Sequence, residues 1–297
     1  MPKQLTMIPI VLSTDHNYVM PTGITILSLL INSSDESYDF HILVSSDVVE
    51  SDCAKLEQQV KAVSPGSEIH FIHIEDAFDD SYEIRGISKA CYYRLLIPWL
   101  LPQYDKVIYC DVDIIFKKGL NELYSVTLDD NYVGGVVTPG VVTNKHSAKY
   151  IQKLGLNPNK YINSGLLLIN SSLQRKNQLK EQYLNLGSRN YFYQDQDIIN
   201  IVCKDKIKYL PLSYNVPPKI LFTSESPIKS SDSVVLHYAG DKPWKQFTYN
   251  WLDWWEVYNK SIFKEDDFNH KVSAHILNRK EWIKHTIKAF KNNVFHR

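Results

Sequence analysis

Residues 107–116, VIYCDVDIIF, form an apolar run that is interrupted by two aspartates one residue apart. A run rich in Val, Ile, Tyr and Phe predicts a strand buried among apolar neighbours. A buried carboxylate costs free energy unless its charge has a partner. We therefore expect Asp111 and Asp113 to end a central strand and to face a ligand or a counter-charge.

The chain before this run alternates strand-like and helix-like patterns. Strands are predicted at IPIVLS, YDFHILVS, EIHFIHI and KVIYC, and helices over residues 18–31, 52–63 and 89–101. This order predicts βαβ units and an α/β fold with a mostly parallel sheet covered on both faces. Such sheets bind ligands at the carboxyl ends of their strands. Asp15 and Asp111 each follow a predicted strand directly.

The pattern beyond residue 116 is less regular. YVGGVV, GLLLIN and SVVLHYAG predict strands, and residues 176–186 and 196–203 predict helices. Pro217, Pro218 and Pro227 fall in a predicted long loop. Because no repeat or low-complexity linker appears, we expect one domain over residues 1–265 and a separate tail over residues 266–297.

Composition excludes several classes of protein. With 297 residues and 44 % hydrophobic content, the chain can bury a substantial core. Its 33 basic and 33 acidic residues balance, so no nucleic-acid partner is expected. Four scattered cysteines favour a reducing compartment. No signal peptide or ~20-residue apolar span is evident, which predicts a cytoplasmic protein with at most peripheral membrane contact.

The two aspartates admit three interpretations. In an extended segment they point to the same side, so they can hold one hard cation such as Mn²⁺ or Mg²⁺. An Asp-x-Asp sequence also occurs as an ordinary turn or helix cap. Alternatively, haloacid-dehalogenase-type phosphatases begin with this motif, but theirs lies on the first strand and has Thr or Val where this chain has Ile115.

Three later segments place further polar residues beside apolar runs. YINSGLLLIN sets Asn163 before a predicted strand, and YQDQDIINIV begins a predicted helix with acids that suit its N-terminus. Taken alone, each is better explained by a turn or a helix cap. VVLHYAGDKPW is more specific, because His237 follows a strand, Gly240 allows close backbone approach and Lys242 can meet an anion.

Taken in order, five segments resemble glycosyltransferase family 8, most closely the bacterial lipopolysaccharide and lipooligosaccharide α-galactosyl- and α-glucosyltransferases. They are STDHNYV, YYRLLIPWLLPQYDKVIYCDVDIIF, YINSGLLLIN, YQDQDIIN and LHYAGDKPW, within residues 8–255. The resemblance implies a single Rossmann-like GT-A domain that binds nucleotide sugars. It also implies retaining transfer of galactose or glucose from a UDP-sugar to a glycan acceptor.

The resemblance assigns roles by position. It implies nucleoside contacts by Ser13, Asp15 and Asn17, and donor sugar or diphosphate contact by Arg94. The implied Mn²⁺ ligands, for which Mg²⁺ is an alternative ion, are Asp111, Asp113 and His237. The donor sugar would meet Asn163, Asp195 and Gln196, and the diphosphate would meet Gly240 and Lys242. We expect front-face transfer in which Asp195 orients the donor and Gln196 stabilises the cationic sugar.

Two positions depart from the family pattern. Only Asp241 separates Gly240 from Lys242, where relatives usually have two residues, so the reach of Lys242 is in question. Thr138 stands where the nearest galactosyltransferases have an acceptor-contacting Asp, so the acceptor is expected to differ.

The tail is basic and amphipathic. Residues 271–297 contain seven Lys or Arg and one acid, Glu281, with apolar residues at helical spacing. This pattern is typical of a helix lying on an anionic membrane, although such a stripe can also pack on its own domain. The leading hypothesis is therefore a transferase that builds a surface glycan on a glycan acceptor, with a lipid-linked glycan as one candidate. The alternatives are a protein-glycosylating or self-glycosylating transferase and a non-catalytic sugar-nucleotide-binding protein.

Overall fold

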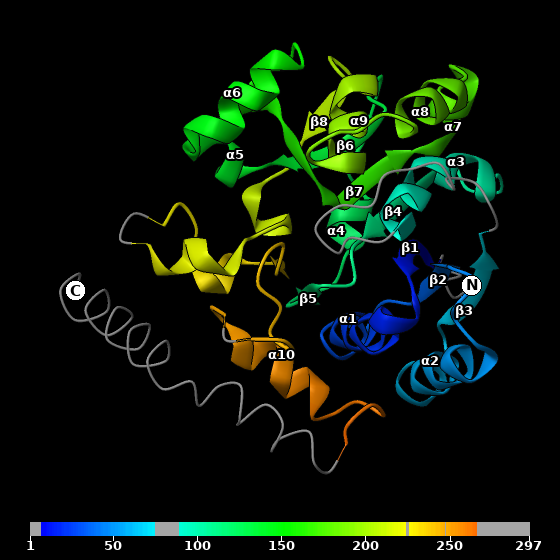
Figure 1. The fold of residues 1–297 in the computed structure, drawn as a ribbon. Helices are drawn as coiled ribbons and strands as arrows, with labels where there is room; N and C mark the ends of the chain where they lie inside the picture. The colour runs from blue at the N-terminus through cyan, green and yellow to red at the C-terminus, as the bar shows by residue number, and fades with distance from the viewer. Residues whose placement is uncertain (1–6, 75–88, 224–225, 247, 266–297) are drawn as a thin grey trace.

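The structure, a computed structural model, describes residues 7–74, 89–223, 226–246 and 248–265. Its centre is a seven-stranded sheet in the order β3-β2-β1-β4-β7-β6-β8 (Figure 1). The strands are β1 (Ile8–Thr14), β2 (Tyr38–Val44), β3 (Glu68–His73), β4 (Lys106–Cys110), β6 (Val133–Val137), β7 (Ile162–Asn170) and β8 (Ile207–Tyr209). Strand β7 is antiparallel to both neighbours, and the other adjacent pairs are parallel. The predicted α/β fold with a mixed, mostly parallel sheet is confirmed.

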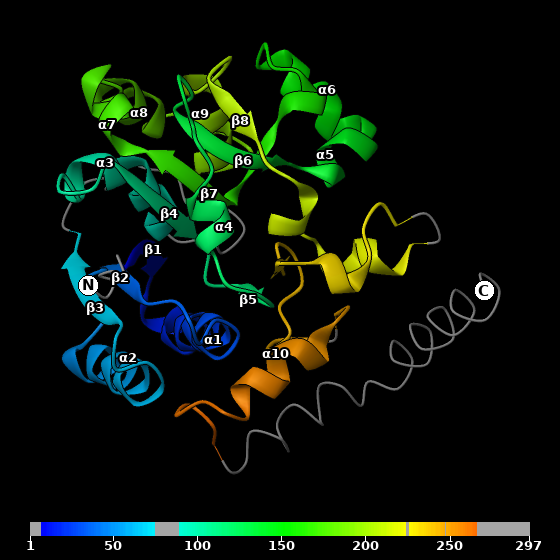
Figure 2. The same cartoon turned by 180° about the vertical axis from the view of Figure 1, so that it is seen from behind.

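Helices cover this sheet on both sides (Figure 2). The α-helices are α1 (Val19–Ile31), α2 (Glu50–Val63), α3 (Ile97–Leu100), α4 (Asn121–Tyr124), α5 (Pro139–Thr143), α6 (Lys145–Lys153), α7 (Ser171–Lys176), α8 (Lys180–Gly187), α9 (Gln194–Val202) and α10 (Trp251–Tyr258). The 3-10 helices are η1 (His16–Tyr18), η2 (Lys89–Leu96), η3 (Pro158–Lys160), η4 (Leu212–Tyr214), η5 (Pro218–Phe222) and η6 (Ser230–Asp232).

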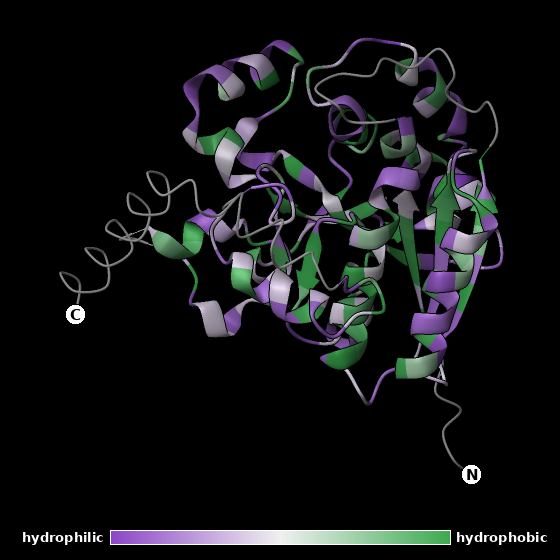
Figure 3. Ribbon diagram, turned by 60° about the horizontal axis from the view of Figure 1, so that its bottom comes forward, coloured by the Kyte–Doolittle hydropathy of each residue, from purple (hydrophilic) through white to green (hydrophobic). Residues whose placement is uncertain are grey.

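Strand β1 shows why both faces need covering. Ile10 and Leu12 pack in one hydrophobic core with residues of α1 and α2, whereas Val11 packs in a second core with residues of η2, α3 and α9. Side chains alternate between the two faces along a strand, so a strand of consecutive apolar residues contributes side chains to both cores. Figure 3 shows apolar strands at the centre and helices with mixed polarity outside.

The run at residues 107–116 is two strands: the predicted strand KVIYC is confirmed as β4, and only the expectation that the strand continues past the aspartates was wrong. Strand β4 ends at Cys110, and β5 (Ile114–Phe116) pairs antiparallel with β9 (Val235–His237) in a separate two-stranded sheet. The hydroxyl of Thr25 in α1 donates to the carbonyls of both Val112 and Ile114, at 2.9 Å each. The aspartate pair therefore lies in the connection between the two sheets, and hydrogen bonds from Thr25 hold that connection against α1.

Three other local predictions were also wrong in detail. Residues 89–101 form η2 followed by the short α3, because Pro98 has no N–H for a helical bond to the preceding turn. Residues 176–186 are divided between α7 and α8, and Gln178 between them has a φ of 54°. Asn163, Ser164 and Gly165 lie inside β7 and do not precede it.

The predicted tail over residues 266–297 lies outside the described residues, so the predicted domain boundary and membrane helix stay predictions. Among the helices that the structure does describe, none is long and apolar enough to cross a membrane.

Candidate active site

A cavity of about 680 Å³ opens where β1, β4 and β9 end. It gathers residues predicted from five distant segments: Ser13, Asp15, Arg94, Asp111, Asp113, Asn163, Asp195, Gln196, His237, Gly240 and Lys242. Asn17 is exposed and does not line this cavity, so its predicted nucleoside contact has no support from this geometry. Thr138 follows β6, at the N-cap of α5, and does not line the cavity either.

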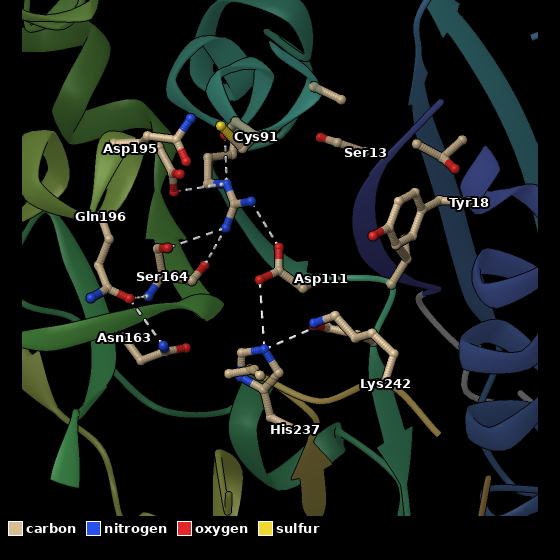
Figure 4. Close-up of a pocket in the computed structure, with 18 of the residues that line it drawn as sticks. Ser13, Tyr18, Cys91, Asp111, Asn163, Ser164, Asp195, Gln196, His237 and Lys242 are labelled. Carbon is tan, nitrogen blue, oxygen red and sulfur yellow. Dashed lines mark hydrogen bonds and ion pairs between the residues drawn. The ribbon is translucent and has the colours of Figure 1, made fainter. Parts of the chain in front are cut away.

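Asp111, Asp113 and His237 converge at one point of the cavity wall (Figure 4). One potential ligand atom from each lies within 4.8 Å of the others. His237 Nε2 is 3.2 Å from Asp113 Oδ1 and 3.7 Å from Asp111 Oδ2. Asp113 Oδ1 is buried and makes no hydrogen bond with any described residue. Two carboxylates and an imidazole form a mixed oxygen and nitrogen set that fits Mn²⁺.

Lys242 reaches this cluster despite the shortened turn. Its ammonium group pairs with the Asp113 carboxylate and donates to the Tyr238 carbonyl at 2.8 Å. Burial alone would raise the pKa of Asp113, but the positive charge of Lys242 and the neighbouring His237 hold it well below the usual range. The cluster thus contains its own cation, which neutralises one carboxylate.

Arg94 connects the aspartate pair to helix α9. The buried guanidinium lies 2.8 Å from Asp111 Oδ1 and 3.2 Å from Asp195 Oδ2, and it donates to the Ser164 carbonyl at 2.8 Å. It also lies over the Tyr109 ring, 4.3 Å from the centroid. Burial raises the pKa of Asp195, and the charge of Arg94 opposes that rise. Arg94 therefore lies between the carboxylates of Asp111 and Asp195 and holds both in fixed positions.

Gln196 is held by strand β7. Its Oε1 accepts hydrogen bonds from the Ser164 backbone N–H at 3.2 Å and from Asn163 Nδ2 at 3.0 Å. The Gly165 N–H donates in turn to Asn163 Oδ1 at 2.8 Å. Because the Gln196 oxygen already accepts two hydrogen bonds, it is poorly placed to attack an electrophile.

Two glycines near the cavity have different neighbours. A Cβ on Gly165 would lie 2.1 Å from His237 Cε1 and 2.7 Å from Asp111 Oδ2, so β7 passes directly behind the candidate metal ligands. A Cβ on Gly240 would meet nothing within 4 Å. Packing therefore requires glycine at residue 165, while any such requirement at residue 240 would come from a ligand.

Some lining or supporting residues were not predicted. Tyr18 lines the cavity, with Lys245 Nζ 5.2 Å from its ring centroid, and it belongs to the STDHNYV segment where an aromatic could have been noticed. Cys91 and Tyr109 line it from η2 and β4. Asn215, which hydrogen-bonds His237, lies in SYNVPP, and nothing in that pattern indicates a site.

Fold and site together define an α/β protein whose sheet carries, at its carboxyl edge, a ligand cavity and a candidate divalent-metal cluster. Residues 9–248 match the family described as Glycosyl transferase family 8, and the chain belongs to that family. It is therefore a glycosyltransferase, and the phosphatase interpretation of Asp111 is set aside.

The chain is 28 % identical to an Escherichia coli lipopolysaccharide 1,2-glucosyltransferase, across 94 % of this chain and 88 % of that protein. It is 24 % identical to a lipopolysaccharide 1,3-galactosyltransferase of Salmonella typhimurium, across 77 % and 71 %. The galactosyltransferase LgtC, solved with donor and acceptor sugar analogues, superposes with a TM-score of 0.75 at 25 % identity, over 89 % of this chain and 100 % of LgtC. The fold is thus the GT-A fold of LgtC.

Proposed function

We propose that this protein transfers galactose or glucose from a UDP-sugar to a glycan acceptor with retention at the anomeric carbon, in the synthesis of lipopolysaccharide or another bacterial surface glycan. The observation that carries the proposal is the convergence of Asp111, Asp113 and His237 beside Lys242 in one cavity. The relatives act on lipopolysaccharide according to their names, which supports this class of acceptor.

The diphosphate end of the site lies around the aspartate pair. Asp111, Asp113 and His237 would hold a Mn²⁺ or Mg²⁺ ion, which when bound supplies Lewis-acid stabilisation to a departing diphosphate. Lys242 would leave Asp113 for the diphosphate, where its charge stabilises the leaving group as negative charge develops. Gly240 presents an unobstructed backbone beside it, so a phosphate oxygen can approach closely.

The nucleoside end lies at the carboxyl end of β1. Ser13 Oγ and Asp15 Oδ1 are buried and have no hydrogen-bond partner among the described residues. These acceptors are therefore free to bind ligand hydroxyl or N–H groups. The Tyr18 ring at the same end offers an aromatic face to a base.

The sugar end lies between β7 and α9. We assign Asp195 to orienting the donor hydroxyls and Gln196 to stabilising the cationic sugar, with substitution on the front face. Asp195 would be the better nucleophile in a double displacement, but it is buried and lies 3.2 Å from the Arg94 guanidinium. Mass spectrometry of the enzyme under turnover is expected to find no glycosyl adduct, and an adduct on Asp195 would overturn the front-face assignment.

The same proposal includes a location in the cell. The enzyme would work in the cytoplasm, and the basic residues 271–297 would contact the inner face of an anionic membrane, close to a lipid-linked acceptor. A truncation after residue 267 tests this contact by partition into anionic liposomes, and unchanged partition would contradict it.

Release of UDP from UDP-galactose and UDP-glucose, with and without Mn²⁺, tests the proposed activity. We expect metal-dependent release with one of the two donors and its loss in Asp113→Asn. A protein that binds UDP-sugars but releases no UDP would indicate the non-catalytic alternative. Transfer to the protein itself, seen as a gain in its mass, would indicate self-glycosylation.

A further inference from the structure

Asn215 links the candidate metal ligand His237 to the strand that holds the sugar-site residues. Asn215 is 3 % exposed and lies directly after η4. Asn215 Oδ1 lies 2.9 Å from His237 Nδ1, and Asn215 Nδ2 donates to Asn163 Oδ1 at 2.8 Å. Asn163 Nδ2 donates in turn to Gln196 Oε1, a contact seen in Figure 4, so a row of side-chain hydrogen bonds connects His237 to Gln196.

Two backbone N–H groups determine which side-chain atoms donate and which accept along this row of hydrogen bonds. The N–H groups of Ser164 and Gly165 can only donate, so the atoms they face must be oxygens: Gln196 Oε1 and Asn163 Oδ1. The amide orientations of Gln196 and Asn163 are thus set by strand β7 and do not depend on the ligand.

The same argument fixes the orientation of the Asn215 amide and the nitrogen of His237 that carries the proton. Because Asn163 Oδ1 is an acceptor, the Asn215 atom facing it must be the donor nitrogen, and the Asn215 oxygen must face His237. A carbonyl oxygen accepts, so His237 carries a proton on Nδ1. In the neutral ring, Nε2 then bears a lone pair and lies 3.2 Å from Asp113 Oδ1, which has no hydrogen bond. Two such acceptors face each other favourably only with a metal ion between them or with a second proton on Nε2.

We propose that Asn215 is a positioning residue that holds His237 in the Nδ1–H tautomer and so presents Nε2 as a metal ligand. Partners on the outer ring nitrogen of a ligating histidine typically fix its tautomer and orientation in this way. The inference rests on the proposed function insofar as Asp111, Asp113 and His237 bind a divalent ion. It adds that the Asn163 side chain of β7 links the orientation of the His237 ring, through Asn215, to the orientation of the Gln196 amide.

The test combines metal affinity with the state of the His237 ring. Asn215→Leu removes both hydrogen bonds with little change in volume. Its matched control is Gln59→Leu, because Gln59 is a 1 % exposed amide that donates to the Gly23 carbonyl away from the cavity. Mn²⁺ titration followed by electron paramagnetic resonance should show affinity lowered about 10- to 100-fold in Asn215→Leu and unchanged in Gln59→Leu.

Nitrogen NMR of metal-free protein with ¹⁵N-labelled histidine gives the second readout. At a pH where His237 is neutral, the wild type should show Nδ1–H, and Asn215→Leu should shift the ring toward Nε2–H. Asn215→Asp should keep Nδ1–H, because a carboxylate still accepts that proton, but it loses the donor to Asn163 Oδ1, so its Mn²⁺ affinity should lie between those of the wild type and Asn215→Leu.

An Nε2–H tautomer in the wild type would overturn the inference, as would wild-type Mn²⁺ affinity in a folded Asn215→Leu. If the wild type binds no Mn²⁺, the proposed metal site fails, while the metal-free tautomer still decides the role of Asn215. Equal loss of affinity in Asn215→Leu and Gln59→Leu would reduce the effect to general destabilisation and contradict the proposal.

Discussion

Gly165→Ala should damage the site more than any other glycine substitution near the cavity. The added Cβ would lie 2.1 Å from His237 Cε1 and 2.7 Å from Asp111 Oδ2, whereas carbon atoms in contact lie about 3.5–4.0 Å apart. Strand β7 is paired on both sides, so the two ligand side chains must move and not the backbone. His237 would be displaced by more than about 1 Å, and a misplacement of this size typically costs ~10²-fold in rate.

That loss corresponds to about 2.7 kcal/mol of transition-state stabilisation. It would be measured as kcat/KM for UDP release in the presence of Mn²⁺, together with Mn²⁺ affinity and melting temperature. Gly140→Ala is the matched control, because a Cβ there meets nothing within 4 Å and residue 140 does not line the cavity. Its activity and Mn²⁺ affinity should match the wild type.

Gly240→Ala separates ligand contact from packing. No described protein atom lies within 4 Å of its added Cβ, so folding and Mn²⁺ affinity should be unchanged while KM for the donor rises. If Gly165→Ala keeps wild-type Mn²⁺ affinity and turnover, β7 does not define the metal geometry and the reasoning fails.

Three further perturbations test separate parts of the account. Asp113→Asn should abolish Mn²⁺ binding and lower kcat at least about a hundredfold, measured by UDP release, since a bound metal is worth several kcal/mol; retained metal-dependent activity would contradict the assignment. Lys242→Met should lower kcat/KM by about 10- to 1000-fold by removing a leaving-group charge, without weakening Mn²⁺ binding, and loss of metal binding would show that Lys242 acts on the ligands instead. Away from the site, burial would raise the pKa of Asp39, but hydrogen bonds from His41 and Tyr104 lower it below its usual value. Because the folded-state pKa is lowered, its stabilisation is present above about pH 4 and is lost as pH falls below that value. Urea unfolding at about pH 6 and pH 3 should therefore show a smaller loss of stability in Asp39→Asn than in the wild type, and equal losses would refute this.

The sequence predicted the central strands well because they are buried on both faces, whereas the half-exposed edge strand β8 was not predicted. Strands β1 and β4 are rich in apolar residues, and β2 is interrupted only by Asp39 and His41, while α1 and α2 have ordinary helix lengths. The alternation of strands and helices predicts that these strands run parallel. It therefore also predicts that Asp15 and Asp111, which follow their strands, lie at the same edge of the sheet.

The local breaks were harder to predict because they depend on distant partners. Residues 107–116 keep one apolar pattern, but β5 leaves the main sheet to pair with β9, more than a hundred residues later. The position of Asn163 inside β7 has the same origin, since its pairing with β6 continues to Ile162 across a bulge. A period-two pattern carries no information about which strand will be the partner.

The sequence predicted the charged residues of the cavity and the neutral Ser13, Asn163, Gln196 and Gly240, but it missed Tyr18, Cys91, Tyr109 and Asn215. Asp, His, Lys and Arg at strand ends are unusual enough to notice, whereas Asn215 and Tyr18 have the composition of common loop residues. The exposed position of Asn17 follows from the turn of η1, whose geometry the sequence does not specify. Gly165 could be recognised only once His237 was found behind it.

The central claim is that Asp111, Asp113 and His237 jointly hold the divalent ion that binds the UDP diphosphate. A crystal grown with Mn²⁺ and UDP, with anomalous data collected near the manganese edge, tests it most directly. The account predicts one anomalous peak in contact with all three side chains and with a diphosphate oxygen, and Lys242 moved from Asp113 to the diphosphate. Bound UDP with no peak between these residues, or a peak ligated elsewhere, would contradict it.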